Sequence, residues 1–216
     1  KSRTYSFNRY NDSIKHGSDD GEARAERDIF RMGKWGFNTV GAWPHPHMIN
    51  SQKIPYIIQV NSPRISYLKS TNKNLVLHWA DFPDFFEPDF ENQMRETLSK
   101  LSAQINSPYC IGVIVDNELS WQAKNGMISS AALTCPPEQP TKKAFLAILK
   151  GKYKDISKLN AAWETSFKNW GELEANRTPI KSPTKEFASD MDAFDETICK
   201  KYFTSCRNAV KSVSPD

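Results

Sequence analysis

The chain has 216 residues, a net charge of +4 at pH 7 and 38% hydrophobic residues. It is long enough for one good core, and no run approaches the roughly 18 apolar residues of a transmembrane helix. Lysine and arginine are scattered among 25 acids without forming a basic block, which argues against nucleic acid binding. The first residues lack the apolar core of a signal peptide. The four cysteines have neither CxxC spacing nor a histidine pattern for zinc, so we expect four free thiols.

The N-terminal part of the chain predicts a loop followed by a helix. Residues 1–21 are polar and interrupted by glycine, so we interpret them as loop. Asp20 is placed to cap a helix over residues 22–34, which presents apolar side chains on one side. Gly36 is placed to end that helix.

Two strands and a second helix are expected next. Residues 37–43 and 54–60 have the composition of buried strands. The connection over 61–89 is too long for a plain connector, and its aromatic and acidic residues suggest a functional loop. A single amphipathic helix is expected over 90–105 and a third strand over 111–115. This rhythm of strand, helix and strand predicts parallel pairing.

The third strand ends abruptly in polar residues. Its β-branched run is followed by Asp116, Asn117, Glu118 and, three residues later, Trp121. Polar side chains at the carboxyl end of a parallel strand usually face a ligand in α/β folds. Asn117 and Glu118 are therefore the first candidates for chemistry.

The remainder of the chain predicts helices. Residues 122–140 look like an extended loop, because they end in a segment rich in proline. The expected helical pieces are 142–153, 156–163 and 169–173, followed by a long helix over 185–213. With about three core strands expected, and about 250 residues in a complete (β/α)8 barrel, the chain is either part of a larger barrel or a small open α/β sheet.

Four stretches carry a family resemblance: Lys34–Trp43, Phe82–Phe90, Ile111–Trp121 and Leu159–Phe167. In order and spacing, over about residues 22–213, they resemble retaining glycoside hydrolases with a (β/α)8 barrel, above all β-agarases (glycoside hydrolase family 50) and next the related β-galactosidases. The resemblance implies an α/β fold. The expected fold is a partial (β/α)8 TIM barrel with parallel strands, about strands two to four and helix four, and a helical insertion after the fourth strand. The whole chain, 1–216, would then be one partial catalytic domain, with 122–184 as a loop and helical cap insertion.

The resemblance also implies a reaction. In the family an Asn-Glu pair at the end of the fourth strand supplies the general acid/base, and Asn117-Glu118 matches it residue by residue. A retaining mechanism needs a second carboxyl group ~5–5.5 Å away, and the family's nucleophilic glutamate would fall after Asp216. Glu118 suits the acid, because a strand end can hold a carboxyl group partly dehydrated. The expected activity is cleavage of β-galactosidic linkages in a galactan or oligosaccharide by retaining double displacement.

Other candidate site residues surround this pair. Asn117 could hydrogen-bond the sugar 2-hydroxyl, and Asp116 is better interpreted as a structural hydrogen-bond acceptor. Trp121 and Trp43 could stack on sugar rings or belong to the core. His45, with the nearby His47, lacks a third metal ligand at a recognisable spacing, so sugar binding or loop structure is favoured over zinc.

The remaining expectations concern partners. No cofactor is expected, since the chain has no phosphate-binding glycine loop or dinucleotide fingerprint. The partner is a carbohydrate substrate, without nucleic acid or membrane, and the resemblance favours a secreted or periplasmic protein. A half barrel leaves sheet edges uncovered, which predicts a second polypeptide or self-association that completes it. The alternative is a catalytically incomplete carbohydrate-binding or scaffold fragment, because no nucleophile is recognisable.

Overall fold

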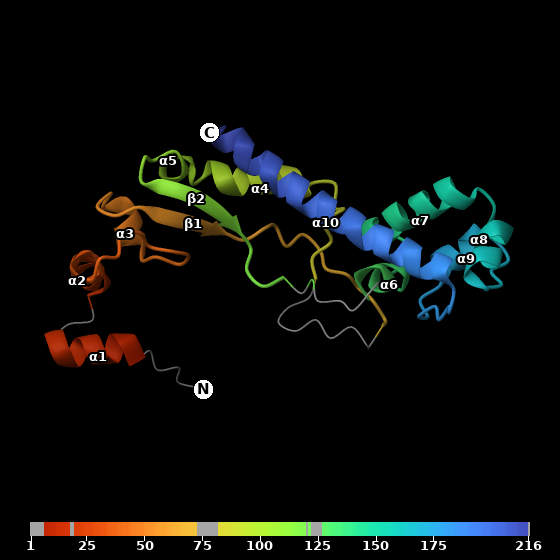
Figure 1. Ribbon diagram of the computed structural model, residues 1–216, viewed down its shortest axis with the longest axis horizontal. Coiled ribbons are helices and arrows are strands. Elements are labelled where there is room, and N and C mark those ends of the chain that lie inside the picture. Colours follow the sequence, from red (N-terminus) through yellow and green to blue (C-terminus); the bar gives the residue numbers. More distant parts are fainter. Residues whose placement is uncertain (1–6, 18–19, 73–81, 120, 122–126, 216) are drawn as a thin grey trace. The chain divides into compact units, whose positions relative to one another are not determined.

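The computed structural model describes residues 7–17, 20–72, 82–119, 121 and 127–215 (Figure 1). Parts of the expected connection (73–81) and of the expected loop (122–126) lie outside the described residues. The chain divides into two compact units. Unit 1 runs to residue 61 and takes in residues 98–115, whereas unit 2 consists of residues 62–97 and 116–215.

A parallel pair of strands organises unit 1. β1 (Tyr56–Val60) pairs with β2 (Cys110–Val115), and Ile58 lies opposite Val113. The register shifts between Tyr56 and Ile57, where β2 has one extra residue. Both strands and their parallel pairing confirm the expectation from the β-branched runs.

The strand expected over 37–43 is wrong. Within it, only Val40 forms an isolated parallel bridge, to Tyr56. Trp43 adopts a φ of 59°. This left-handed conformation ends extended structure just before Pro44. The described part of the sheet therefore has two strands, where three core strands were expected.

The helices of unit 1 correct one expectation and confirm another. α1 (Phe7–His16) lies in the segment interpreted as loop, which was therefore wrong for these residues. α2 (Gly21–Lys34) confirms the expected helix. The Asp20 side chain caps it by accepting from the main-chain N–H groups of Glu22 and Ala23. The short helices of the unit are α3 (Pro46–Asn50) and α5 (Ser102–Ile105).

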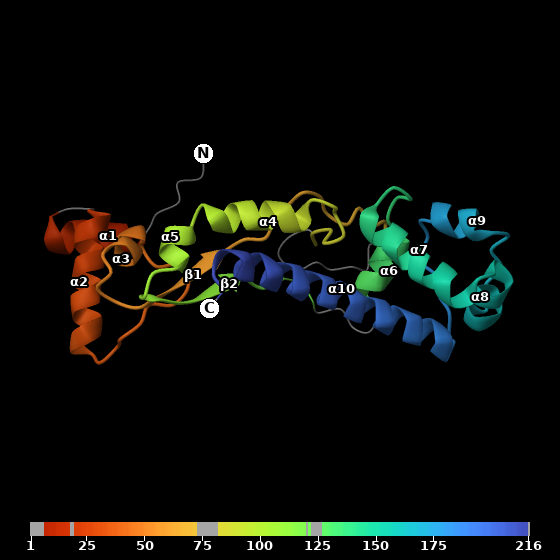
Figure 2. The ribbon, with the colours of Figure 1, turned by 90° about the horizontal axis from the view of Figure 1, so that it is seen from above.

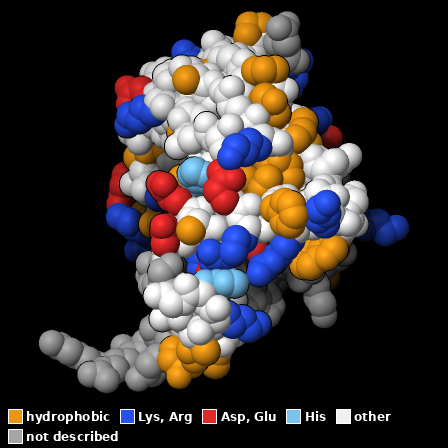
Figure 3. Space-filling model, turned by 90° about the vertical axis from the view of Figure 1, so that its left-hand side faces the viewer, with side chains coloured by type: hydrophobic (Ala, Val, Ile, Leu, Met, Phe, Trp, Pro, Cys, Tyr) orange, Lys and Arg blue, Asp and Glu red, His pale blue; other side chains and the backbone are white. Residues whose placement is uncertain are grey.

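The core of unit 1 lies on one face of the sheet. Tyr56, Ile58 and Val60 alternate as buried residues along β1. The Tyr56 hydroxyl donates to the carbonyl oxygen of Gln104 at 2.9 Å, which ties β1 to α5. By contrast, Ile111 and Ile114 on β2 are 59% and 39% exposed. Figure 3 faces the N-terminal side of unit 1, where charged side chains of both signs are interspersed with hydrophobic ones.

Unit 2 is mainly helical. Its helices are α4 (Phe90–Ser99, whose end belongs to unit 1), α6 (Met127–Leu133), α7 (Pro140–Tyr153), α8 (Ile156–Trp163), α9 (Trp170–Ala175) and α10 (Lys185–Val213). α6 and α8 pack against α10, and α7 contacts α6 and α8 (Figure 2). The Phe145 ring of α7 stacks on Phe194 of α10 with 4.0 Å between the centroids.

Two of the predictions for this part of the chain need correction, and the expected helices α7, α8, α9 and α10 are present. The single helix expected over 90–105 is broken into α4 and α5, and α6 lies where a loop was expected. The bounds of α8 and α10 agree with the prediction. All four cysteines are free thiols, as expected. Among the described residues, none of the helices combines the length and apolar character needed to cross a bilayer.

Candidate functional site

The chain makes an unusual turn directly after β2. Asp116 has a φ of 60° and Glu118 a φ of 50°. Such left-handed conformations cost roughly 1–3 kcal/mol each in residues other than glycine, and they persist only where the surroundings hold them. The turn leaves Asn117 and Glu118 exposed to solvent.

Asp116 is the buried anchor of this turn. Its Oδ1 accepts hydrogen bonds from the main-chain N–H of Ser62 at 2.9 Å and from Arg64 Nη2 at 2.7 Å. Its Oδ2 accepts from the Tyr202 hydroxyl at 2.9 Å. The residue is 4% exposed. Burial and the neighbouring Asp116 carboxylate raise the pKa of the Tyr202 hydroxyl, which therefore stays protonated as a donor. These contacts agree with the interpretation of Asp116 as a structural acceptor.

Glu118 can present its carboxyl group to a ligand, since the turn carries its side chain into solvent. The expectation that the strand end holds Glu118 partly dehydrated is wrong for this structure. Glu118 is exposed within a turn that has left-handed backbone conformations at Asp116 and Glu118.

Trp121 belongs to an aromatic cluster in unit 2. Its ring centroid lies 5.3 Å from Phe82, 5.3 Å from Tyr202 and 5.8 Å from Phe203, the last in a stacked arrangement. The side chain is half-buried. Much of its apolar surface is therefore used in packing, and the Tyr202 contact links the cluster to the Asp116 anchor.

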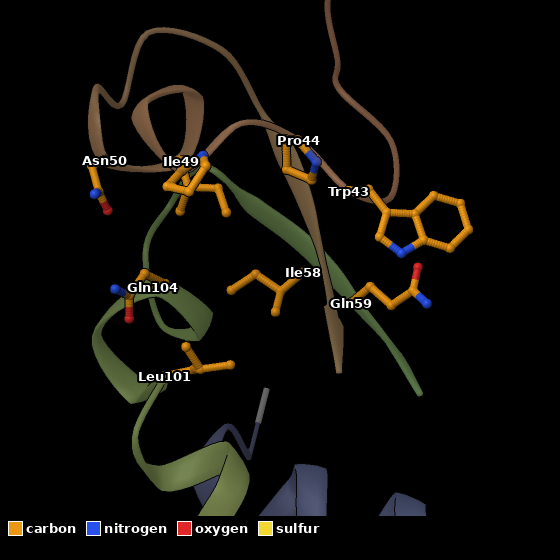
Figure 4. Close-up of a pocket in the computed structure, with 9 residues that line it drawn as sticks. Trp43, Pro44, Ile49, Asn50, Ile58, Gln59, Leu101 and Gln104 are labelled. Atoms are coloured by element: carbon orange, nitrogen blue, oxygen red, sulfur yellow. The ribbon is translucent and has the colours of Figure 1, made fainter. Parts of the chain in front are cut away.

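Trp43 lies at a groove in unit 1 (Figure 4). The cavity has a volume of about 310 Å³. Trp43 is 68% exposed despite its strained backbone. The Oε1 atom of Gln59, on β1, is buried in the structure without a hydrogen-bond partner. Two further amides, Asn50 and Gln104, line the groove. Its other lining residues are apolar: Pro44, Pro46, Ile49, Ile58 and Leu101.

The two histidines have local partners. His45 caps α3, because its Nδ1 accepts from the main-chain N–H of His47 at 3.2 Å. Its Nε2 lies against Gly21, where an added Cβ would come within 2.8 Å. His47 Nε2 lies 2.6 Å from Glu26 Oε1. The described residues hold no group of three or more potential metal ligands.

Four residues of these sites were missed by sequence reasoning, and one of them, Ser62, donates its main-chain N–H to Asp116. Gln59 interrupts an apolar strand, which was a usable signal. Tyr202 was placed only on the apolar stripe of its helix, and Arg64 had no distinguishing pattern. Their roles depend on contacts between distant parts of the chain, such as Tyr202 with Asp116, 86 positions apart.

Comparisons with known proteins show what the chain is similar to. The family model for glycoside hydrolase family 42, described as β-galactosidase, matches residues 52–216. β-Agarase B from Vibrio sp. (strain JT0107) is 32% identical over 100% of this chain and 24% of its own length. β-Agarase A from the same strain is 27% identical over 98% of this chain and 22% of its own length.

The chain is also similar in fold to solved structures of agarases. A structure of an exo-β-agarase superposes with a TM-score of 0.86 at 29% identity, over 98% of this chain and 30% of that one. A crystal structure of an agarase, AgWH50C, gives a TM-score of 0.79 at 26% identity, over 93% of this chain and 29% of that one. The chain thus spans about a quarter of the curated relatives' length and under a third of these structures'.

Proposed function

Because the chain belongs to the β-galactosidase family 42 of glycoside hydrolases, we propose that the protein containing it cleaves β-galactosidic linkages in a galactan or oligosaccharide, as an agarase does. The observation that carries the proposal is the exposed Glu118 on a firmly anchored turn, inside the segment that the family model matches. A carboxyl group that is exposed but fixed at its backbone can meet a substrate in a defined orientation.

In the proposed retaining mechanism Glu118 is the general acid/base. It donates its proton to the glycosidic oxygen as the bond from that oxygen to the anomeric carbon breaks. A second carboxylate attacks the anomeric carbon, and the glycosyl-enzyme is then hydrolysed by water that Glu118 deprotonates. That second carboxylate is expected outside residues 1–216, on a later barrel strand.

The proposed substrate contacts are Asn117, Trp43, Trp121 and His45. Asn117 is exposed beside Glu118 and can donate to a sugar hydroxyl. Trp43 offers an exposed ring, and the buried acceptor of Gln59 in the same groove supports a ligand with hydroxyl groups there. Trp121 has only part of its ring surface left for a sugar. His45 would have to act through Nε2, since Nδ1 is engaged as the cap of α3.

We also propose that the two strands are part of a (β/α)8 barrel, completed by further polypeptide or by self-association. The parallel pairing of β1 with β2 supports this, as does the exposure of Ile111 and Ile114. Apolar strand residues left in water favour association with a covering surface. The short share of the agarase structures that the chain covers also supports this view.

The test is Glu118→Gln in the full-length protein that contains this chain. Aryl β-galactosides with leaving groups of graded acidity are compared by kcat/KM, which reports formation of the glycosyl-enzyme. For phenol leaving groups we expect a loss of roughly 10²–10⁴-fold, because they need protonation. For dinitrophenol, which leaves unprotonated, kcat/KM should change little.

Glu164→Gln is the matched control, because Glu164 is another exposed glutamate with a positive φ, located at the end of α8. It should retain the leaving-group dependence of the unmodified protein. Unchanged turnover of the phenyl substrate by Glu118→Gln would remove the proposal. Galactan binding by the full-length protein without any cleavage would instead favour the carbohydrate-binding or scaffold alternative.

A further inference from the structure

The turn that carries Glu118 is held from two separate directions. Ser62 and Arg64 follow β1 in the chain, and Tyr202 lies on α10. All three donate to the two carboxylate oxygens of Asp116, whose side chain is 2% exposed. Arg64 also donates to the Ser62 hydroxyl, at 2.5 Å, so that two of the donors are tied to each other.

These contacts have a consequence two residues further along the chain. The backbone conformation of Asp116 directs the chain into the second left-handed residue, Glu118. A glutamate has no intrinsic preference for that conformation, so the conformation must be imposed by its surroundings. The side chain of Glu118 is exposed, whereas the buried carboxylate of Asp116 accepts from three donors.

We infer that Asp116 is the positioning residue for Glu118: its buried carboxylate, held by Ser62, Arg64 and Tyr202, fixes the turn that places the acid/base. The inference rests on the proposed function, in which Glu118 donates the proton. Asp116 itself contacts no substrate in this scheme. Its effect is geometric, because a misplacement of about 1 Å in a catalytic group can cost on the order of 10²-fold in rate.

The experiment is Asp116→Asn in the full-length protein, measured with the same graded aryl β-galactosides. Asparagine tolerates a positive φ and keeps an acceptor for Ser62, but it cannot accept from both Arg64 and Tyr202 as a carboxylate does. We expect kcat/KM for the phenyl substrate to fall roughly 10²-fold and that for the dinitrophenyl substrate to fall less than about tenfold. This selectivity is the signature of impaired proton donation to the leaving group.

Asp190→Asn is the matched control. Asp190 is also a buried carboxylate with three hydrogen-bond donors, all of them side chains, but it lies inside the regular helix α10. It should lower the Tm and leave the leaving-group dependence unchanged. Equal losses for both substrates in Asp116→Asn would overturn the inference, because they would indicate a purely structural role.

A second variant keeps the test decisive if Asp116→Asn does not fold. Tyr202→Phe preserves the carboxylate and removes one donor, so a smaller loss with the same selectivity is expected, and a loss without selectivity overturns the inference. The outcome is also separable from the proposed function. If Glu118→Gln loses more kcat/KM with the phenyl than with the dinitrophenyl substrate and the Asp116 and Tyr202 variants do not, only the positioning role fails. If Glu118→Gln shows no such difference between the two substrates, the proposed function fails.

Discussion

Asp116 and Asp190 are two buried carboxylates with the same number of hydrogen-bond donors and different surroundings. Asp190 accepts from Lys152 Nζ at 2.5 Å, Tyr153 Oη at 2.6 Å and Trp163 Nε1 at 2.9 Å. Its backbone is ordinary helix, so these contacts join α10 to α7 and α8. Asp116 lies instead in a left-handed turn that precedes an exposed carboxyl group. The comparison shows that one kind of network can stabilise packing in one place and a backbone conformation in another.

The largest stability effect is expected at Asp190. Asp190→Ala leaves the buried donors of Tyr153 and Trp163, and the exposed Lys152, without their acceptor, and we expect the free energy of unfolding to fall by about 3 kcal/mol. Urea denaturation monitored by tryptophan fluorescence measures it. Asp192→Ala, two positions along the same helix at an exposed site, should stay within about 0.5 kcal/mol of the unmodified protein. Equal stability of the two variants would contradict the role assigned to the Asp190 network.

Raising the pH should lower the free energy of unfolding through Cys206, whose thiol is influenced by the charge of Asp116, by less than Asp190→Ala does. Burial, followed by the charge of Asp116, raises the pKa of Cys206 from 9.0 to about 12. Because the folded state holds this proton more tightly, the stabilisation is complete below pH 9 and is lost as pH rises toward 12. The loss due to Cys206 should reach about 2 kcal/mol at pH 10.5.

Urea unfolding at pH 8 and pH 10.5 tests this pH dependence. Cys206→Ala should lose less stability between the two pH values than the unmodified protein does. An equal loss of the free energy of unfolding between pH 8 and pH 10.5 in both proteins would show that the Cys206 thiol does not titrate in the way its surroundings imply.

Replacing Trp43 is expected to change the free energy of unfolding least. Its effect should appear instead in substrate binding. Trp43→Ala should raise KM for a galactan oligosaccharide roughly tenfold, the loss of about one good aromatic contact. Trp35 is 70% exposed in the same unit and does not line the groove, so Trp35→Ala is the matched control. Similar KM values for the two variants would remove Trp43 from the proposed substrate contacts.

The sequence predicted those parts of the fold that depend on local pattern. β1, β2, α8 and α10 follow from runs of apolar residues at strand or helix spacing. α6 was missed because its sequence, MISSAAL, is short and rich in small residues, and its burial against α10 is a long-range contact. The expected strand over 37–43 failed because composition does not encode the left-handed backbone of Trp43.

The candidate site was predicted in the same uneven way. Asn117 and Glu118 could be singled out because a strand ended in polar residues and because the motif resembled a known family. The anchoring contacts of Asp116 could not be predicted, since Ser62 and Tyr202 lie 54 and 86 positions from Asp116 in the chain. The exposure of Glu118 was also unpredictable, because it depends on φ values that spacing does not reveal.

The most direct test of Glu118 as acid/base is rescue of Glu118→Ala by azide in the full-length protein, with dinitrophenyl β-galactoside as substrate. Azide needs no general base, so it can attack the anomeric carbon of the glycosyl-enzyme and displace the enzyme carboxylate. The account predicts faster turnover with added azide and a galactosyl azide of β configuration, identified by NMR. Turnover that does not respond to azide, or an azide product of α configuration, would contradict the account.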